Sequence, residues 1–260
     1  MKYGFIGCGN MGGAIAKALS KQTKNIILSD PSAAVTLADT LGCTFGSNED
    51  VINNCDCVFL AVKPQILEIV LKPLHSLIAS KKPLIISMAA GIEIARIQSY
   101  IGCNVPIIRI MPNTPVSVGK GMISYCKNEF VKDTDINQFL QDMQYAGQMC
   151  EIPERLMDAA TAISGCGPAY MYMFLEALAD GGVSCGLSRE QALQYAAATM
   201  SGAAEMIIRT GKHPGELKDA VCSPGGSTIE GVKVLEENSF RGIVMDCVIA
   251  AYNKNKALGQ

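Results

Sequence analysis

A glycine-rich loop near the N-terminus most constrains the fold of this chain. Residues Gly7 to Gly12 follow the pattern G-x-G-x-x-G, directly after the apolar run Tyr3 to Ile6 and at the opening of the helical pattern Met11 to Lys21. Between a strand and a helix, at the start of a βαβ unit, this pattern is typical of a loop that binds a dinucleotide. Each glycine has a role: a tight turn, a close approach of the backbone to a pyrophosphate, and close packing of the helix on the strand. The alternative is a glycine-rich turn without a ligand, and the strand before the loop and the helix after it favour the dinucleotide site instead.

The helix after the loop adds an electrostatic argument. Its first N–H groups are unpaired within the helix, and the positive end of its dipole points at the phosphates. We therefore expect the loop to bind NADPH or NADH. The residues expected to line this part of the cofactor site are Ile6, Gly7, Cys8, Gly9, Asn10, Met11 and Gly12.

The pattern of the loop's surroundings continues through the first part of the chain. Further short apolar runs predict buried strands at Asn25–Ser29, Cys57–Val62, Leu84–Ser87 and Ile107–Ile110, and helical spacing recurs at Ser32–Leu41 and Gln65–Ala79. Near-continuous apolar strands separated by helices indicate a parallel sheet covered on both faces. The predicted class is α/β, with an N-terminal Rossmann domain of mostly parallel sheet over residues 1–155.

Around residue 155 the strands end and an all-α domain follows, predicted over residues 156–260. Its helices are expected at Pro168–Gly181, Arg189–Thr210, Gly215–Val221, Ser227–Glu236 and Phe240–Lys256, and Ser188 with Gln191 resembles a capping box. The first two helices are apolar on more than one face, which is typical of buried helices. Because a domain of this size has little room to bury them, we expect a homodimer or higher oligomer formed through this all-α dimerisation domain.

Composition excludes several other classes of protein. With 260 residues, 49% of them hydrophobic and a net charge of −2, the chain has no basic block for nucleic acid or an anionic membrane. Its 11 cysteines contain no C-x-x-C pair, which favours reduced thiols over a disulfide framework or a metal site. The start resembles a strand rather than a signal peptide, and no apolar stretch is long enough for a membrane span, so a cytoplasmic location is expected.

The end of the second predicted strand bears on the choice of cofactor, and two interpretations remain open. Asp30 can accept hydrogen bonds from the adenosine ribose hydroxyls, which favours NADH. Alternatively, Ser29 and Ser32 serve a 2′-phosphate while Asp30 caps the next helix before Pro31.

Five further segments, taken with the first loop, closely resemble the pyrroline-5-carboxylate reductase family. The likeness runs from the first strand to the last helices, in order and without a large insertion. It implies an NAD(P)H-dependent oxidoreductase that reduces 1-pyrroline-5-carboxylate to L-proline, the last step of proline biosynthesis. The segments are Ala61-Val62-Lys63-Pro64, Ser87-Met88-Ala89-Ala90-Gly91, Arg109-Ile110-Met111-Pro112-Asn113-Thr114-Pro115, Ser164-Gly165-Cys166-Gly167-Pro168-Ala169-Tyr170 and Asp219-Ala220-Val221-Cys222-Ser223-Pro224-Gly225-Gly226-Ser227-Thr228.

For the cofactor, the resemblance extends the site beyond the loop. Residues Ala61, Val62, Lys63 and Pro64 meet its ribose and nicotinamide side in the family, although Lys63-Pro64 also reads as a helix start with proline in the first position. The small residues Ala89, Ala90 and Gly91 leave room for the nicotinamide. Asn48 matches a position near the adenosine, and a plain helix N-cap is the alternative.

For the substrate, the residues 223–228 alone predict a turn followed by a helix from about Ser227. Its free N–H groups can hold a carboxylate, and a helix-turn-helix joint with a serine cap is the alternative. The resemblance favours the ligand site. It places Val221, Ser223, Gly226, Ser227 and Thr228 around the substrate ring and carboxylate, with Thr228 closest to the ring nitrogen and the imine between this segment and the nicotinamide.

The expected chemistry needs few titratable groups. A protonated cyclic imine already accepts hydride at carbon, so positioning supplies most of the catalysis. His75 and His213 are expected on solvated surfaces, and Arg109 is expected to be buried and to hold backbone carbonyls of the turn after it. Two positions depart from relatives: Ala220, where some have a polar residue, and Gly211, where others have an acidic one.

Two other functions compete with this interpretation. A β-hydroxyacid dehydrogenase of the 3-hydroxyisobutyrate type shares the glycine-rich loop and a helical second domain, but needs a lysine on a buried helix. Lys212, Lys218 and Lys233, the candidates before the last helix, do not lie on a long apolar helix. A dinucleotide-sensing regulator without turnover would not need the segment that ends at Thr228.

Overall fold

The computed structural model describes residues 1–258, which form two compact units. The first contains residues 1–166 together with the end of the chain from Ala251, and the second contains Gly167–Ala250. The all-helical part begins within the first unit, at Met157, and the last helix contributes to both units. The domain boundary that the sequence places after residue 155 stays a prediction.

The first unit is built on an eight-stranded sheet with the order β3-β2-β1-β4-β5-β6-β7-β8. Its pairings are parallel, except that β7 runs antiparallel to β6. The predicted mostly parallel sheet is therefore confirmed. The strands are β1 (Tyr3–Ile6), β2 (Ile26–Ser29), β3 (Thr44–Phe45), β4 (Cys57–Leu60), β5 (Leu84–Ser87), β6 (Ile107–Met111), β7 (Gly121–Lys127) and β8 (Gly147–Glu151).

Helices cover both faces of this sheet, as the apolar strands require. They are α1 (Asn10–Leu19), α2 (Ala34–Leu41), α3 (Asn48–Asn54), α4 (Pro64–Leu71), α5 (His75–Lys81), α6 (Ile94–Ile101), α7 (Asp133–Asp142) and α8 (Met157–Ser164), with 3₁₀ turns η1 (Lys72–Leu74), η2 (Thr114–Val118), η3 (Met143–Tyr145) and η4 (Glu154–Leu156). The predicted helix Gln65–Ala79 was wrong as one element. It divides at η1, because Pro73 lacks the N–H that a continuous helix needs.

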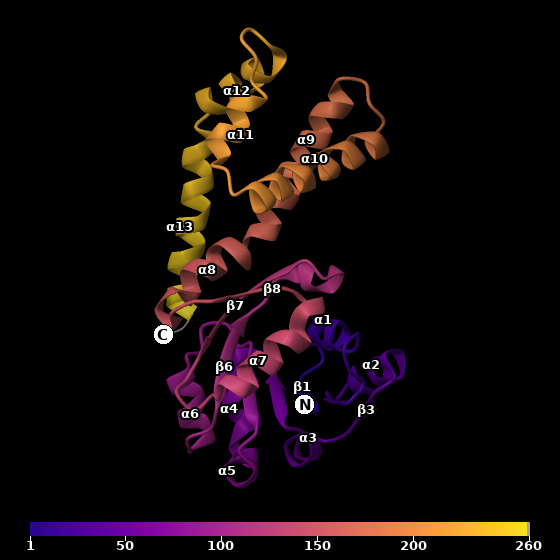
Figure 1. Cartoon of the computed structure of the whole chain (residues 1–260), viewed down its shortest axis with the longest axis vertical. Coiled ribbons are helices and arrows are strands. Elements are labelled where there is room, and N and C mark those ends of the chain that lie inside the picture. Colours follow the sequence, from indigo (N-terminus) through magenta and orange to yellow (C-terminus); the bar gives the residue numbers. More distant parts are fainter. Residues whose placement is uncertain (259–260) are drawn as a thin grey trace. The chain divides into compact units, whose positions relative to one another are not determined.

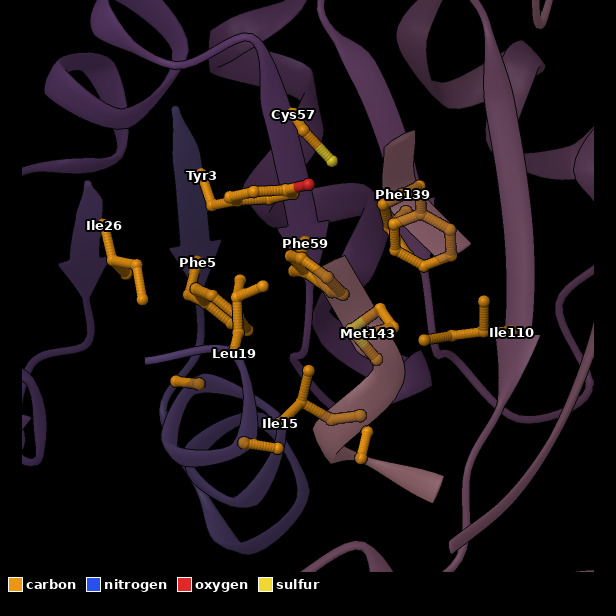
Figure 2. Close-up of a cluster of buried hydrophobic side chains, with 14 of the residues drawn as sticks. Tyr3, Phe5, Ile15, Leu19, Ile26, Cys57, Phe59, Ile110, Phe139 and Met143 are labelled. Carbon is orange, nitrogen blue, oxygen red and sulfur yellow. The ribbon is translucent and has the colours of Figure 1, made fainter. Parts of the chain in front are cut away.

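Alternate side chains of the central strands β1, β2, β4, β5 and β6 enter two separate cores. Phe5 and Phe59 stack with ring centroids 4.4 Å apart on the face covered by α1, α2 and α7, whereas Val58 and Leu60 point to the face covered by α3 to α6. Figure 2 shows the first core, with Phe139 and Met143 beside Phe59. Burial on both faces fixes the register, since a slip of one residue would exchange the two sets of side chains.

The second unit is all α-helix, in agreement with the predicted pattern. Its helices are α9 (Gly167–Ser184), α10 (Arg189–Thr210), α11 (Pro214–Ala220), α12 (Ser227–Glu237) and α13 (Phe240–Leu258). The Ser188–Gln191 capping box is confirmed at the start of α10, and α9 and α10 lie side by side (Figure 1). Within residues 1–258, no helix is long and apolar enough to cross a membrane.

This unit buries little within one chain. Its core residues are the small side chains Ala179, Ala192 and Ala196. By contrast, Met173 on α9 is 70% exposed and Ile208 on α10 is 61% exposed. Large exposed apolar surfaces mark sites of association, which fits the expected oligomer.

Candidate functional site

The glycine-rich loop connects β1 to α1 and takes its shape from close backbone contacts. Gly7 has a φ of +98°, and a Cβ there would lie 2.7 Å from the carbonyl oxygen of Ala61. At Gly12 a Cβ would lie 2.5 Å from the carbonyl oxygen of Gly7 and 2.8 Å from Cβ of Ala61. These two glycines therefore serve the turn and the packing of α1 against the end of β4.

Gly9 differs from both, because no neighbouring protein atom requires a glycine at this position. A Cβ at Gly9 would meet nothing within 4 Å, and its φ of −65° suits any residue. It is the N-cap of α1, and no side chain caps this helix. The free space and the uncapped N–H groups together fit the close approach of a pyrophosphate. The loop therefore has both the space and the free N–H donors that the pyrophosphate of a dinucleotide needs.

Asp30, at the end of β2, is tied to this loop. Its Oδ2 accepts a hydrogen bond from the Cys8 backbone N–H at 2.8 Å, and its Oδ1 accepts from the N–H groups of Ser32 and Ala33, both at 2.9 Å. Partial burial acts to raise the pKa of the carboxyl, but these hydrogen bonds together hold it below its usual value. Asp30 is not the N-cap of α2, which is Ala33. Its carboxylate instead holds the turn before that helix and the loop at the same time.

Ser29 and Asn48 form a second polar pair beside Asp30. The Ser29 hydroxyl donates to Oδ1 of Asn48 at 2.7 Å. The alternative of Asn48 as an N-cap is wrong, because Ser47 caps α3 in a capping box with Asp50. Asn48 is the first residue of that helix, and its side chain is directed to the end of β2, the place expected for adenosine contacts.

The ends of β4 and β5 bring the other expected cofactor residues to the same edge of the sheet. β4 pairs with β1 and β5 with β4, all parallel, so the segments after these strands leave the sheet at its carboxyl edge. Lys63 is the N-cap of α4 with Pro64 in its first turn, as the dipeptide predicted. After β5, Ala89 is buried and Gly91 has a φ of +73°. From β1 the chain continues to β2 and β3 on one side of the sheet and then crosses to β4 on the other side of β1. Open α/β sheets bind ligands at the carboxyl ends of the strands where the strand order reverses in this way.

Arg109 is buried as expected, but its partner was predicted wrongly. Its Nη1 lies 3.0 Å from Oε1 of Glu154, and no bond to backbone carbonyls of the turn forms. The turn is held instead by Asn113, whose Nδ2 donates to the Ser164 carbonyl at 2.8 Å and whose Oδ1 accepts from Met122 N–H at 2.9 Å. A buried guanidinium is better stabilised by a carboxylate than by neutral carbonyl groups. No local sequence pattern indicates this pair, because its members are 45 residues apart.

The expected substrate segment lies in the helical unit, between α11 and α12. Gly225 has a φ of +68°, and the Gly226 N–H donates to the Ser223 carbonyl at 3.0 Å. The positive φ of Gly225 favours glycine at that position. At Gly226, whose φ is −79°, a Cβ would lie 2.6 Å from Oγ of Ser223, a hydroxyl that can rotate away. Val221 is the C-cap of α11 and is 65% exposed.

The start of α12 has open donors. The helix begins at Ser227, as predicted, its N-cap is Gly226, and no side chain caps it. The alternative of a serine cap is therefore wrong. The N–H groups of its first turn, including those of Ser227 and Thr228, have no partners within the helix. Both side chains are exposed in the chain.

The two histidines lie on the surface, as expected. His75 begins α5 and is exposed. His213 is the N-cap of α11, where its Nδ1 accepts the Gly215 N–H at 3.0 Å. This structural task explains its position without a catalytic role.

The fold and this loop define a nicotinamide-dinucleotide-dependent oxidoreductase with an all-helical second part. Residues 2–91 match the family described as NADP oxidoreductase, coenzyme F420-dependent, and residues 154–258 match pyrroline-5-carboxylate reductase dimerisation. Pyrroline-5-carboxylate reductases of Synechocystis and Escherichia coli K12 are 40% and 39% identical, each over 100% of this chain and over 99% and 98% of their own.

Solved structures agree with these relatives. The Plasmodium falciparum pyrroline carboxylate reductase with NADP bound has a TM-score of 0.90 at 39% identity, covering 100% of this chain and 98% of its own. The Coxiella burnetii pyrroline-5-carboxylate reductase has a TM-score of 0.92 at 31% identity, with the same coverage. The chain therefore belongs to the pyrroline-5-carboxylate reductase family.

Proposed function

We propose that this protein reduces 1-pyrroline-5-carboxylate to L-proline, with NADH or NADPH as the reductant. The main support is a likeness that spans the whole chain and includes both the loop at Gly9 and the segment that ends at Thr228. The bound cofactor would supply the hydride for the imine carbon. The remaining steps fall to side chains and backbone groups of this chain.

Cofactor binding is assigned to the carboxyl edge of the sheet. The space at Gly9 and the uncapped start of α1 would hold the pyrophosphate. Asp30 and Asn48 would face the adenosine side, and Ala89 to Gly91 would leave room for the nicotinamide. The proposed site is completed, between its adenosine and nicotinamide sides, by Ala61, Val62, Lys63 and Pro64.

Substrate binding is assigned to the turn before α12. The first N–H groups of this helix would hold the substrate carboxylate, so no arginine is needed there. The hydroxyl of Thr228 would accept the N–H of the protonated imine and orient the ring. Val221, Ser223 and Gly226 would surround the rest of the small molecule. Because the protonated imine is already electrophilic, this arrangement needs no acid with a shifted pKa.

The lysines of the helical part argue against a hydroxyacid dehydrogenase. Lys212 pairs with Glu216 at 2.6 Å, Lys218 with Asp219 at 3.0 Å, and Lys233 with Glu237 at 3.9 Å. All three are at least partly exposed, with side-chain exposures of 52%, 38% and 63%. A lysine that donates a proton to a developing alkoxide should instead be desolvated in a cleft.

We also infer that the working form is a homodimer or a larger assembly of dimers, joined through the apolar faces of α9, α10 and α13. Assembly would bury side chains such as Met173 and Ile208, which one chain leaves exposed. The free cysteines agree with a reducing, cytoplasmic location. The net charge of −2 agrees with a small-molecule partner rather than nucleic acid.

The direct test is a steady-state assay on the full-length protein. We expect oxidation of NADH or NADPH that depends on 1-pyrroline-5-carboxylate and produces an equal amount of L-proline. A β-hydroxyacid with oxidised cofactor serves as the competing substrate and should give no turnover. Cofactor binding without turnover of either substrate would instead support a sensing role and contradict the proposal.

A further inference from the structure

We propose that Asp30 makes this protein prefer NADH over NADPH. The inference rests on the proposed cofactor site and goes beyond it by naming the side chain that discriminates. The NADP-bound relative from Plasmodium falciparum shares the fold. Because the shared fold does not by itself select one cofactor, the argument rests on the side chains next to the loop, at the end of β2.

The position of the carboxylate is the first argument. Oδ2 of Asp30 lies 2.8 Å from the backbone nitrogen of Cys8, inside the loop that would hold the pyrophosphate. Three donors from Ser32 and Ala33 hold Oδ1 at 2.9 to 3.1 Å. The carboxylate is thus fixed beside the loop, where an acidic residue accepts hydrogen bonds from ribose hydroxyls.

The charge is the second argument. The same hydrogen bonds keep the pKa of Asp30 low, although partial burial acts in the opposite direction, so the group is anionic at neutral pH. A 2′-phosphate adds roughly two more negative charges at that pH. Residues 29–41, which form the end of β2, the following turn and α2, contain no lysine or arginine to offset them.

In the absence of a cation, Ser29 and Ser32 would have to bind the 2′-phosphate, but both hydroxyls already donate hydrogen bonds within the protein. Ser29 is only 7% exposed, and its hydroxyl donates to Asn48 at 2.7 Å. The Ser32 hydroxyl donates to Asp30 itself at 3.1 Å. Neither hydroxyl can donate to a phosphate without losing its present acceptor. The structure therefore favours the NADH interpretation of this strand end over the alternative.

The groove next to the loop also contains no cation. A groove of about 450 Å³ runs between α1 and α2, beside the loop. It is lined by Cys8, Gly9, Asn10, Gly13, Ala33, Thr36, Leu37 and Thr40. Since none of these is basic, the groove gives a second phosphate no compensating charge.

The test measures binding of NADH and NADPH to the full-length protein by fluorescence titration, without imine. We expect NADH to bind at least about tenfold more tightly. The substitution D30N keeps the size of the side chain and removes its charge, and it should reduce this ratio at least about fivefold. D39N removes one negative charge from the exposed face of α2 and is the matched control, for which the ratio should not change.

A second variant covers the case in which D30N disturbs the loop. S32R leaves Asp30 in place, adds a cation at an exposed position and changes the net charge by the same amount as D39N. It should strengthen NADPH binding and leave NADH binding nearly unchanged. Equal wild-type affinities, or a ratio that neither D30N nor S32R moves, would overturn the inference. Failure to bind either cofactor would contradict the proposed function instead.

Discussion

A single carboxylate oxygen of Glu154 serves two buried elements of the Rossmann unit. Oε1 lies 3.0 Å from Nη1 of Arg109 on β6 and accepts the backbone N–H of Ile94, the first residue of α6, at 2.8 Å. The Arg109 side chain is only 3% exposed, whereas that of Glu154 is 30% exposed. Among the described residues, Nε of Arg109 is also the one buried side-chain polar atom without a hydrogen-bond partner. The guanidinium therefore depends heavily on this carboxylate.

Replacing Glu154 by glutamine should destabilise the protein through Arg109. The amide still accepts the Ile94 N–H, but the buried cation loses its counter-charge. Breaking a buried pair costs about 3–5 kcal/mol, and the partial exposure of Glu154 reduces our expectation to about 2 kcal/mol. Urea unfolding measures the change, with E68Q on the exposed side of α4 as the control. Because R109M/E154Q contains no unpaired cation, it should be more stable than E154Q alone, and equal stability of the two variants would count against this explanation.

Alanine at Gly9 and at Gly12 should have opposite consequences. The Cβ of G9A would meet no protein atom, so we expect unchanged or slightly higher stability, by up to about 1 kcal/mol. It would occupy the space assigned to the pyrophosphate and weaken cofactor binding about 10- to 100-fold. G12A would clash with Gly7 and Ala61 and lower stability by about 1–3 kcal/mol. Thermal unfolding and cofactor titration of both variants provide the check, and normal cofactor binding by G9A would exclude this role for Gly9.

The elements that sequence periodicity predicted are those with a strong local pattern. The strands Tyr3–Ile6 and Leu84–Ser87 and the helix Arg189–Thr210 have the predicted bounds, because apolar runs and a capping box mark their ends. The short strand β3 consists of two exposed residues and has no such pattern. The strand β7 runs antiparallel to β6, and nothing local to it signals that direction.

The candidate site likewise contains features that the local sequence predicts and features that it does not. Backbone-directed features, such as Gly7, Gly12 and the start of α12, follow from local chain geometry and could be predicted. Side-chain partners could not, because Arg109 with Glu154, or Ser29 with Asn48, meet only after the sheet has formed. The sequence therefore leaves the choice between NADH and NADPH open, and the preference proposed above rests on hydrogen bonds of Ser29, Asp30 and Ser32 that only the structure contains.

Alkaline pH should destabilise the protein partly through Cys126. Burial, together with the nearby Glu154, raises the pKa of this thiol from 9.0 to about 12 despite the opposing charge of Arg109. In the unfolded chain the thiol ionises near 9.0, so its contribution to stability is complete below that pH and is lost as the pH rises toward 12. Urea unfolding at several values between pH 8 and 11 should show a smaller decline for C126A than for the wild type. C150A, at an exposed cysteine, should keep the wild-type slope, and parallel slopes for all three proteins would refute the prediction.

Removing the Thr228 hydroxyl should slow turnover without affecting the cofactor. A hydrogen bond to a charged group contributes about 1.5–3 kcal/mol, so we expect kcat of T228A to fall about 10- to 100-fold. T228S keeps the hydroxyl and should recover most of the activity. NADH and NADPH titrations of both variants should match the wild type. A loss of cofactor affinity as large as the loss of kcat would show that Thr228 does not have the proposed role.

A charge on the apolar face of α9 should separate the subunits. Met173 is 70% exposed in one chain and lies on a helix that is apolar on more than one face, so we expect it to be buried on assembly. Burying an unpaired carboxylate is strongly unfavourable, and M173E should therefore shift the protein toward monomers in light scattering at micromolar concentration. The control is I69E on α4, where an isoleucine 71% exposed belongs to the Rossmann unit and should tolerate the charge. A wild-type protein that is already monomeric, or an M173E variant that assembles as well as I69E, would mean that α9 does not form the interface.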